Sequence, residues 1–126
     1  MSAKILLVED DRPIAEGLST LLTEEGYGVE CAYNGQEALD LMQAPNMPQL
    51  VLLDLMMPVM TGWELREKML LDSRLCQIPV AVLSGVSDLQ VNEPTLRANA
   101  YFGKPLDCIK LLDFISSTLA GHSCGH

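Results

Sequence analysis

The middle of the chain reads Val51-Leu52-Leu53-Asp54-Leu55-Met56-Met57-Pro58, which sets a single carboxylate within a short apolar run. A short apolar run that is bounded by a turn signal predicts a buried strand, and Asp54 falls where that strand ends. The carboxyl ends of strands are the places where open α/β sheets bind ligands. Asp54 does not suit a helix cap, because Pro58 and Gly62 separate it from the next helical pattern. Asp54 is therefore the first candidate functional residue.

A second acidic run follows another apolar segment, near the start of the chain. The segment Ile5-Leu6-Leu7-Val8 leads directly into Glu9-Asp10-Asp11. Asp11 suits an N-cap, because Pro13 follows it in what would be the first helical turn. Glu9 and Asp10 are then left beside Asp54, at one edge of a predicted sheet. Carboxylates side by side repel one another, so this edge suits a bound cation.

The rest of the chain alternates between strand-like and helix-like segments. Strands are expected near residues 4–9, 28–33, 50–54, 79–84 and 100–103. Helices are expected from apolar stripes at helical spacing, from N-caps at Asn34 and Thr61, and from a stop at Gly26. The stripes consist of Ile14, Leu18, Leu21 and Leu22, then Ala38, Leu41 and Met42, and finally Ile109, Leu112, Ile115 and Leu119. Strict alternation predicts a three-layer α/β fold, with a five-stranded parallel sheet and helices on both faces.

The segment between the fourth and fifth strands breaks this pattern. A helix could start at Ser87, but Pro94 would remove a backbone hydrogen bond and clash with the preceding turn. We expect a loop with one helical turn there.

Length and composition limit the classes of protein. A chain of 126 residues with 48% hydrophobic residues is expected to form one domain with a buried core, over residues 1–121, followed by a flexible tail at 122–126. Four widely spaced cysteines, Cys31, Cys76, Cys108 and Cys124, predict buried thiols in place of disulfides or a zinc site. No apolar run has the length of a membrane span and no signal peptide is seen, so we expect a cytoplasmic location. The net charge of −9 argues against nucleic acid and suits a cation or a basic partner.

Two further polar residues end predicted strands. Ser84 follows Val80-Ala81-Val82-Leu83, and Lys104 follows Ala100-Tyr101-Phe102-Gly103. Each residue alone is weak evidence for function, since a serine there is commonly a turn residue and a lysine is commonly solvated. Together with the carboxylates they form a set that suits a hard divalent cation and a phosphoryl group.

In this order the motifs make the chain similar to the receiver domain of two-component response regulators over nearly its whole length. The resemblance implies a sheet of strand order 2-1-3-4-5 and Asp54 as the phosphoacceptor. It also implies Mg²⁺, for which Mn²⁺ can substitute. The resemblance implies that the metal is bound by Asp10, Asp54 and the backbone carbonyl of Met56, with Glu9 acting through water. It implies that the acyl phosphate is contacted by Ser84 and Lys104. It also implies that the conformational switch uses Ser84 and Tyr101.

The resemblance also implies a role and its partners. The domain would take a phosphoryl group from a phosphohistidine on a sensor histidine kinase or a histidine phosphotransfer protein. Phosphorylation would switch a surface that binds a downstream protein target, in a monomer or weak dimer. Such a domain is not an enzyme, beyond catalysing its own phosphorylation and slow self-dephosphorylation. Slow loss is expected because Met56, two residues after the acceptor, cannot hold a water in line with the phosphorus.

Three alternatives belong to other classes. A degenerate receiver would bind partners without phosphorylation, but the complete set of acids, Ser84 and Lys104 argues against it. A phosphohydrolase with an aspartyl nucleophile typically has a second acid two residues after the first, where this chain has Met56. A flavin-binding module would want a phosphate loop rich in glycine and hydroxyls after the first strand, and the acids at 9–11 have the wrong charge for that.

Overall fold

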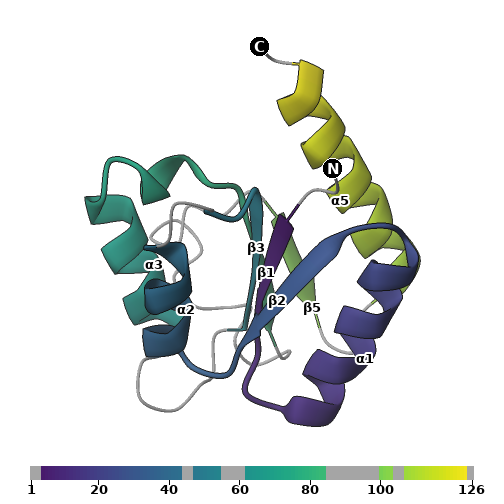
Figure 1. The fold of residues 1–126 in the computed structure, drawn as a ribbon, viewed down its shortest axis with the longest axis horizontal. Helices are drawn as coiled ribbons and strands as arrows, with labels where there is room; N and C mark the ends of the chain where they lie inside the picture. Colours follow the sequence, from purple (N-terminus) through teal and green to yellow (C-terminus); the bar gives the residue numbers. More distant parts are fainter. Residues whose placement is uncertain (1–3, 44–46, 55–61, 85–99, 104–106, 125–126) are drawn as a thin grey trace.

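The fold is a single parallel sheet covered on both faces by helices (Figure 1). A computed structural model of the chain describes residues 4–43, 47–54, 62–84, 100–103 and 107–124. The sheet has the order β2-β1-β3-β4-β5, and each neighbouring pair of strands runs parallel. The strands are β1 (Lys4–Val8), β2 (Gly28–Ala32), β3 (Leu50–Asp54), β4 (Val80–Ser84) and β5 (Ala100–Gly103). The predicted fold class and strand order are confirmed.

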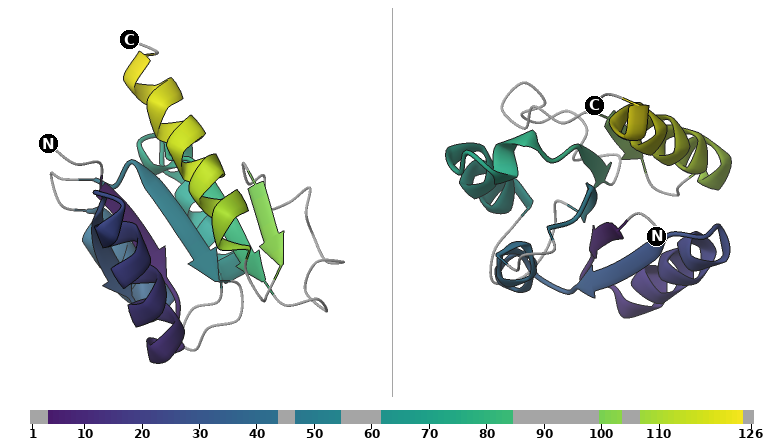
Figure 2. Two further views of the ribbon diagram at one scale, coloured as in Figure 1. Left: turned by 90° about the vertical axis from the view of Figure 1, so that its right-hand side faces the viewer. Right: turned by 45° about the horizontal axis from the view of Figure 1, so that its top comes forward.

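The helices form the two outer layers of the fold. They are α1 (Arg12–Glu24), α2 (Gly35–Met42), α3 (Gly62–Leu71) and α5 (Cys108–Cys124), with a short 3₁₀ helix η1 (Leu75–Gln77) before β4. Helices α1 and α5 cover one face of the sheet, and α2 and α3 cover the other (Figure 2). The loop expected near residues 85–99 lies outside the described residues. None of the described helices is both long enough and apolar enough to cross a membrane.

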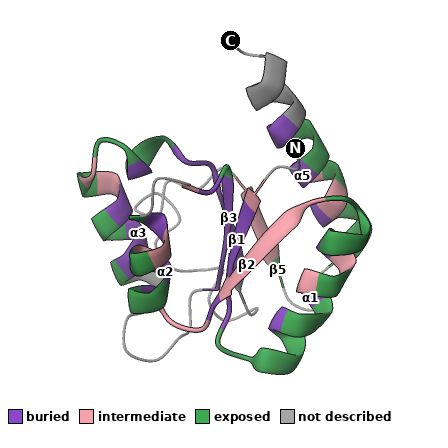
Figure 3. Cartoon of the chain, in the orientation of Figure 1, coloured by how far each residue is buried: buried purple, intermediate pink, exposed green. Residues whose placement is uncertain are grey.

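The central strands are buried on both faces, as Figure 3 shows for β1 and β3. Alternate residues of β1 face opposite layers: Leu6 and Val8 pack toward α2 and α3, while Ile5 and Leu7 pack toward α1 and α5. This double burial explains the continuous apolar runs that predicted the strands, because each side chain meets a helix on one side or the other. It also leaves the carboxyl ends of the strands as the place where polar residues can gather.

Two of the expected helix caps, Asp11 and Asn34, are present, while the third, Thr61, lies outside the described residues. Asp11 Oδ1 accepts a hydrogen bond of 3.2 Å from the backbone N–H of Ile14, which starts α1. Asn34 Oδ1 accepts one of 2.9 Å from the N–H of Glu37, and Glu37 Oε1 in turn accepts one of 2.8 Å from the N–H of Tyr33. These reciprocal bonds satisfy donors that the first turn of α2 leaves without intrahelical partners.

Two details of the predicted apolar stripes are wrong. Ile109 is 74% exposed, and the buried stripe of α5 runs instead through Leu111, Ile115 and Leu119. Ile109 lies two residues before Leu111, so it points to the opposite side of a helix with 3.6 residues per turn. Ile14, in the first turn of α1, is also exposed.

The last described element is helix α5, which extends to Cys124. The domain boundary at residue 121 stays a prediction. The flexible tail over 122–126 stays a prediction, since only the helical backbone to Cys124 is described.

The cysteines are less buried than predicted. Cys31 is partly buried, whereas Cys76 and Cys108 are exposed, and all three are free thiols. Cys76 lies in η1 at the surface and Cys108 begins α5, so neither faces the sheet. The prediction of buried thiols is therefore wrong for Cys76 and Cys108, while the absence of a disulfide among these three cysteines is confirmed.

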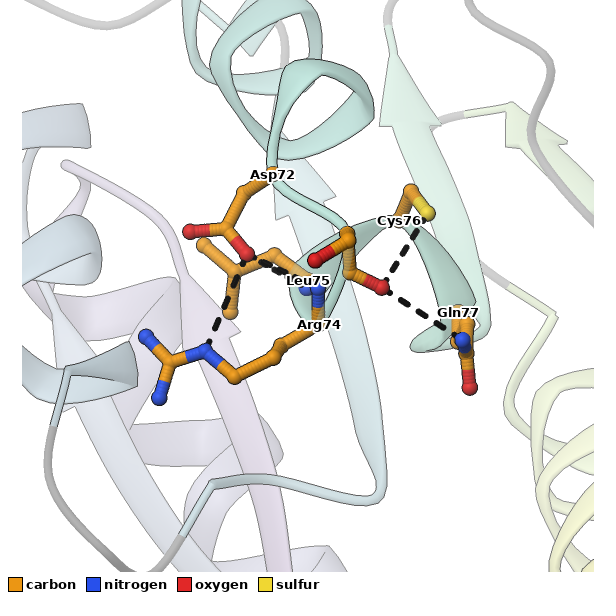
Figure 4. A network of polar contacts seen from close by, with 6 residues as sticks. Asp72, Arg74, Leu75, Cys76 and Gln77 are labelled. Atoms are coloured by element: carbon orange, nitrogen blue, oxygen red, sulfur yellow. Dashed lines mark hydrogen bonds and ion pairs between the residues drawn. The ribbon is translucent and has the colours of Figure 1, made fainter.

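The connection between α3 and β4 is held by Asp72 (Figure 4). Asp72 Oδ1 accepts hydrogen bonds of 2.8 Å and 3.3 Å from the backbone N–H groups of Arg74 and Leu75. These two bonds lower the pKa of the Asp72 carboxyl below its ordinary value of 3.8, and the nearby Arg74 guanidinium lowers it further. The charged form of Asp72 is thus fixed by its own loop, which turns the chain into β4.

Candidate functional site

The acidic site forms where two neighbouring strands end. Strands β1 and β3 pair in parallel, with Val8 opposite Leu53. Glu9, the first residue after β1, therefore lies level with Asp54, the last residue of β3. One carboxylate oxygen from each of Glu9, Asp10 and Asp54 lies within 4.8 Å of the others. The structure thus brings together the three acids that the sequence placed at this edge.

Burial differs among the three acids. Glu9 and Asp54 are 1% and 3% exposed, while Asp10 is exposed. Carboxylates that lie close together repel one another, so a cation is the natural complement of this cluster. The cluster is open to solvent on the side of Asp10 and closed by the core on the other side.

Hydrogen bonds at the end of β1 determine which acids of residues 9–11 face Asp54. The N–H of Glu9 donates a hydrogen bond of 2.9 Å to the carbonyl of Ala32, which continues the pairing with β2. Glu9 Oε2 accepts a hydrogen bond of 3.3 Å from the N–H of Asp11. Since Asp11 caps α1 with its own carboxylate, Glu9 and Asp10 are the two acids of this run that face Asp54.

The donor set of the cluster fits a hard divalent cation. Carboxylate oxygens are the ligands that Mg²⁺ and Mn²⁺ prefer, whereas soft metals prefer thiolates and imidazoles. All three side chains of the cluster are carboxylates. Mg²⁺ usually binds through one or two protein carboxylates and keeps several waters, which agrees with two buried acids and one exposed acid.

The other predicted site residues are described only in part. Ser84 is the last residue of β4 and pairs with Gly103, the residue that precedes Lys104 in the sequence. The side chain of Ser84 and all of Lys104 and Met56 lie outside the described residues. Tyr101 is partly buried on β5 and packs against the core between the sheet and the layer of α2 and α3. Its predicted part in a switch remains a prediction.

One feature beside the acids was missed by the sequence analysis. The guanidinium carbon of Arg12 lies 4.0 Å from the centroid of the Tyr33 ring, in a cation–π contact between the start of α1 and the end of β2. Arg12 follows the acidic run directly, but its partner is 21 residues away in the numbering and is defined only by the parallel pairing of β1 with β2.

Known proteins share both the sequence pattern and the fold of this chain. The family model for the response regulator receiver domain matches residues 5–116. A probable transcriptional regulator, ycf29, from Pyropia yezoensis is 34% identical over 122 residues, which are 95% of this chain and 54% of that protein. The chain therefore spans about half the length of this curated relative.

Solved structures give the same family. The signal receiver domain of a signal transduction histidine kinase from Syntrophus aciditrophicus is 32% identical with a TM-score of 0.88, over 95% of this chain and 92% of that chain. The receiver domain of a sensor histidine kinase from Pseudomonas aeruginosa, solved with a magnesium ion in its active-site cleft, has a TM-score of 0.86 at 20% identity, over 95% and 99% of the two chains. The chain belongs to the response regulator receiver domain family, whose members act in two-component signalling.

Proposed function

We propose that Asp54 accepts a phosphoryl group from a phosphohistidine on a sensor histidine kinase or a histidine phosphotransfer protein. The observation that carries this proposal is the cluster of Asp54 with Glu9 and Asp10 at the carboxyl edge of the sheet. A buried carboxylate close to two others is repelled by their negative charge. It gains a function if a cation and a phosphoryl group bind there.

The three acids of the cluster would take different parts in binding the metal. We propose that Asp10, Asp54 and the backbone carbonyl of Met56 bind Mg²⁺ directly and that Glu9 acts through a water. Mg²⁺, when bound, neutralises charge on the phosphoryl oxygens. The magnesium ion of the Pseudomonas structure supports this choice of metal, as does the hard donor set of the cluster.

The transfer step needs positioning more than covalent chemistry from the protein. A carboxylate oxygen of Asp54 attacks the phosphorus in line with the bond to the histidine nitrogen; the new P–O bond forms as the P–N bond breaks and the histidine leaves. Burial of Asp54 limits the access of water to the site during this step. Lys104 would contact the phosphoryl oxygens, and Ser84 would bond one of them and draw its loop inward, with Tyr101 following.

The wider role follows from this chemistry. Phosphorylation would change the surface that binds a downstream protein target, in a cytoplasmic monomer or weak dimer. The family is regulatory, and we propose no enzymatic activity beyond self-phosphorylation and slow self-dephosphorylation. The high negative charge of the chain suits a basic partner surface.

Incubation with acetyl phosphate and Mg²⁺, followed by intact-mass analysis, tests the assignment. We expect one phosphoryl group on the wild-type protein and none on Asp54→Asn, because the amide is not nucleophilic enough to attack phosphorus. Asp72→Asn is the matched control: it removes one aspartate from the surface and should leave labelling unchanged. Equal labelling of wild-type protein and Asp54→Asn would exclude Asp54 as the acceptor.

A further inference from the structure

Arg12 occupies a position where its charge needs an explanation. It is the first residue of α1 and follows Glu9, Asp10 and Asp11 in the sequence. Within the described part of the chain, Arg12 makes no ion pair with any carboxylate, and its guanidinium stacks on Tyr33 at 4.0 Å. An exposed arginine beside several acids therefore binds an aromatic ring in preference to them.

The alternative position for Arg12 is over the acidic cluster. Side chains in a helix lean toward its N-terminus, and the N-terminus of α1 is the end that meets the carboxyl edge of the sheet. Arg12 is only two residues from Asp10, which is exposed. A guanidinium binds carboxylates through two parallel hydrogen bonds, so a released Arg12 would occupy the oxygens that a divalent cation needs.

Tyr33 is held firmly enough to act as a platform. Its backbone N–H donates to Glu37 Oε1 at 2.8 Å, and its side chain packs against the core between the sheet and the layer of α1 and α5. The preceding residue, Ala32, accepts the hydrogen bond from the N–H of Glu9. The backbone at Tyr33 is therefore held by Glu37 and, through Ala32, by Glu9, while the ring is held by its packing against the core.

We propose that Tyr33 is a positioning residue that keeps the guanidinium of Arg12 off Asp10, the exposed acid of the cluster, so that this carboxylate can bind Mg²⁺. This role rests on the proposed metal site and deepens it. An exposed cation–π contact and an exposed ion pair are interactions of similar strength, so removing the ring shifts the balance toward an ion pair of Arg12. Loss of the ring would turn Arg12 into a competitor of the metal.

A double-mutant cycle measured by calorimetric Mg²⁺ titration tests this role. The four proteins are the wild type, Tyr33→Ala, Arg12→Ala and the double variant. We expect Tyr33→Ala to weaken Mg²⁺ binding about two- to fivefold when Arg12 is present, which is the effect of one competing exposed ion pair. In the Arg12→Ala background the same change should leave the affinity unchanged. Tyr33→Phe retains the ring and should bind Mg²⁺ like the wild type.

A second measurement reports on the metal-free proteins. The Nε–H of Arg12 should exchange with water more slowly in Tyr33→Ala than in the wild type, as observed by NMR, because it would donate to a carboxylate. Unchanged Mg²⁺ affinity in Tyr33→Ala, or equal weakening with and without Arg12, would overturn the role of Tyr33 alone. Failure of the wild-type protein to bind Mg²⁺ would overturn the metal site itself, and this role with it.

Discussion

Asp72 and Asp54 are both aspartates at the end of a regular element, yet their surroundings are opposite. Asp72 keeps 32% of its side chain exposed, accepts two backbone N–H bonds and has Arg74 nearby. Asp54 is 3% exposed and lies within 4.8 Å of two other carboxylates. A carboxylate with a structural role is supplied with donors by its own loop. A carboxylate that gathers with like charges, from strands far apart in sequence, indicates a site for a cation.

The same contrast separates neighbours in the first acidic run. Asp11 is not a member of the cluster, and its Oδ1 accepts the N–H of Ile14 at the start of α1. Asp10, one residue earlier, belongs to the cluster with Asp54. One position in the chain therefore separates a helix cap from a proposed metal ligand.

The largest effect is expected from replacing Lys104, the cation that is predicted to contact the phosphoryl oxygens. Asp72 has Arg74 two residues away, whereas the predicted cation for phosphoryl oxygens is Lys104, after β5. Lys104→Ala should lower the rate of phosphorylation by acetyl phosphate about 100-fold, the usual cost of removing one group that stabilises transition-state charge. Lys110→Ala, which removes an exposed lysine from α5, is the control. A rate for Lys104→Ala close to that of Lys110→Ala would contradict the assignment.

In thermal melts, the rise in Tm with Mg²⁺ should depend on the aspartates of the cluster and not on Asp72. A ligand that binds only the native state stabilises it, by about 1.4 kcal/mol at ten times its Kd, which raises the Tm of a domain of this size by about 5 °C. We expect this rise for the wild type and for Asp72→Asn, but not for Asp54→Asn or Asp10→Asn. If Mg²⁺ raises the Tm of all four proteins equally, it does not bind at the cluster.

The smallest effect concerns the acid stability supplied by Asp72. Its pKa is lowered in the folded state, mainly by the N–H groups of Arg74 and Leu75, so the unfolded state binds more protons in acid. The stabilisation is therefore present above the ordinary value of 3.8 and is lost as the pH falls through the lower folded pKa. The Tm difference between wild type and Asp72→Asn should be present at pH 7 and vanish in strong acid. A difference independent of pH would show that charge is not involved.

Much of the fold was predictable because the sheet is buried on both sides. Apolar runs as short as five residues then identify strands, and in parallel strands the residue after each run falls at one edge. This reasoning predicts that Glu9, Asp10 and Asp54 lie together, as they do in the structure. The caps at Asp11 and Asn34 were also predictable, since their hydrogen bonds are local.

The features that were missed depend on contacts that are not local. The exposure of Ile109 depends on which side of α5 meets the sheet. Helical spacing in the sequence does not decide between Ile109 and Leu111, two positions later. The exposure of Cys76 depends on η1, whose first residue, Leu75, donates its backbone N–H to Asp72. The stack of Arg12 on Tyr33 requires β1 and β2 to be neighbours. Composition and periodicity carry none of this information.

The most direct test of the central claim is to locate the phosphoryl group on the unmodified protein. Borohydride reduces an aspartyl phosphate to homoserine, so the acceptor can be identified by tandem mass spectrometry of peptides after phosphorylation with Mg²⁺ present. We predict homoserine at residue 54 and unchanged aspartates at residues 10, 11 and 72. Homoserine at residue 10, or a phosphorylated protein with an intact Asp54, would contradict the assignment of Asp54 as the phosphoacceptor.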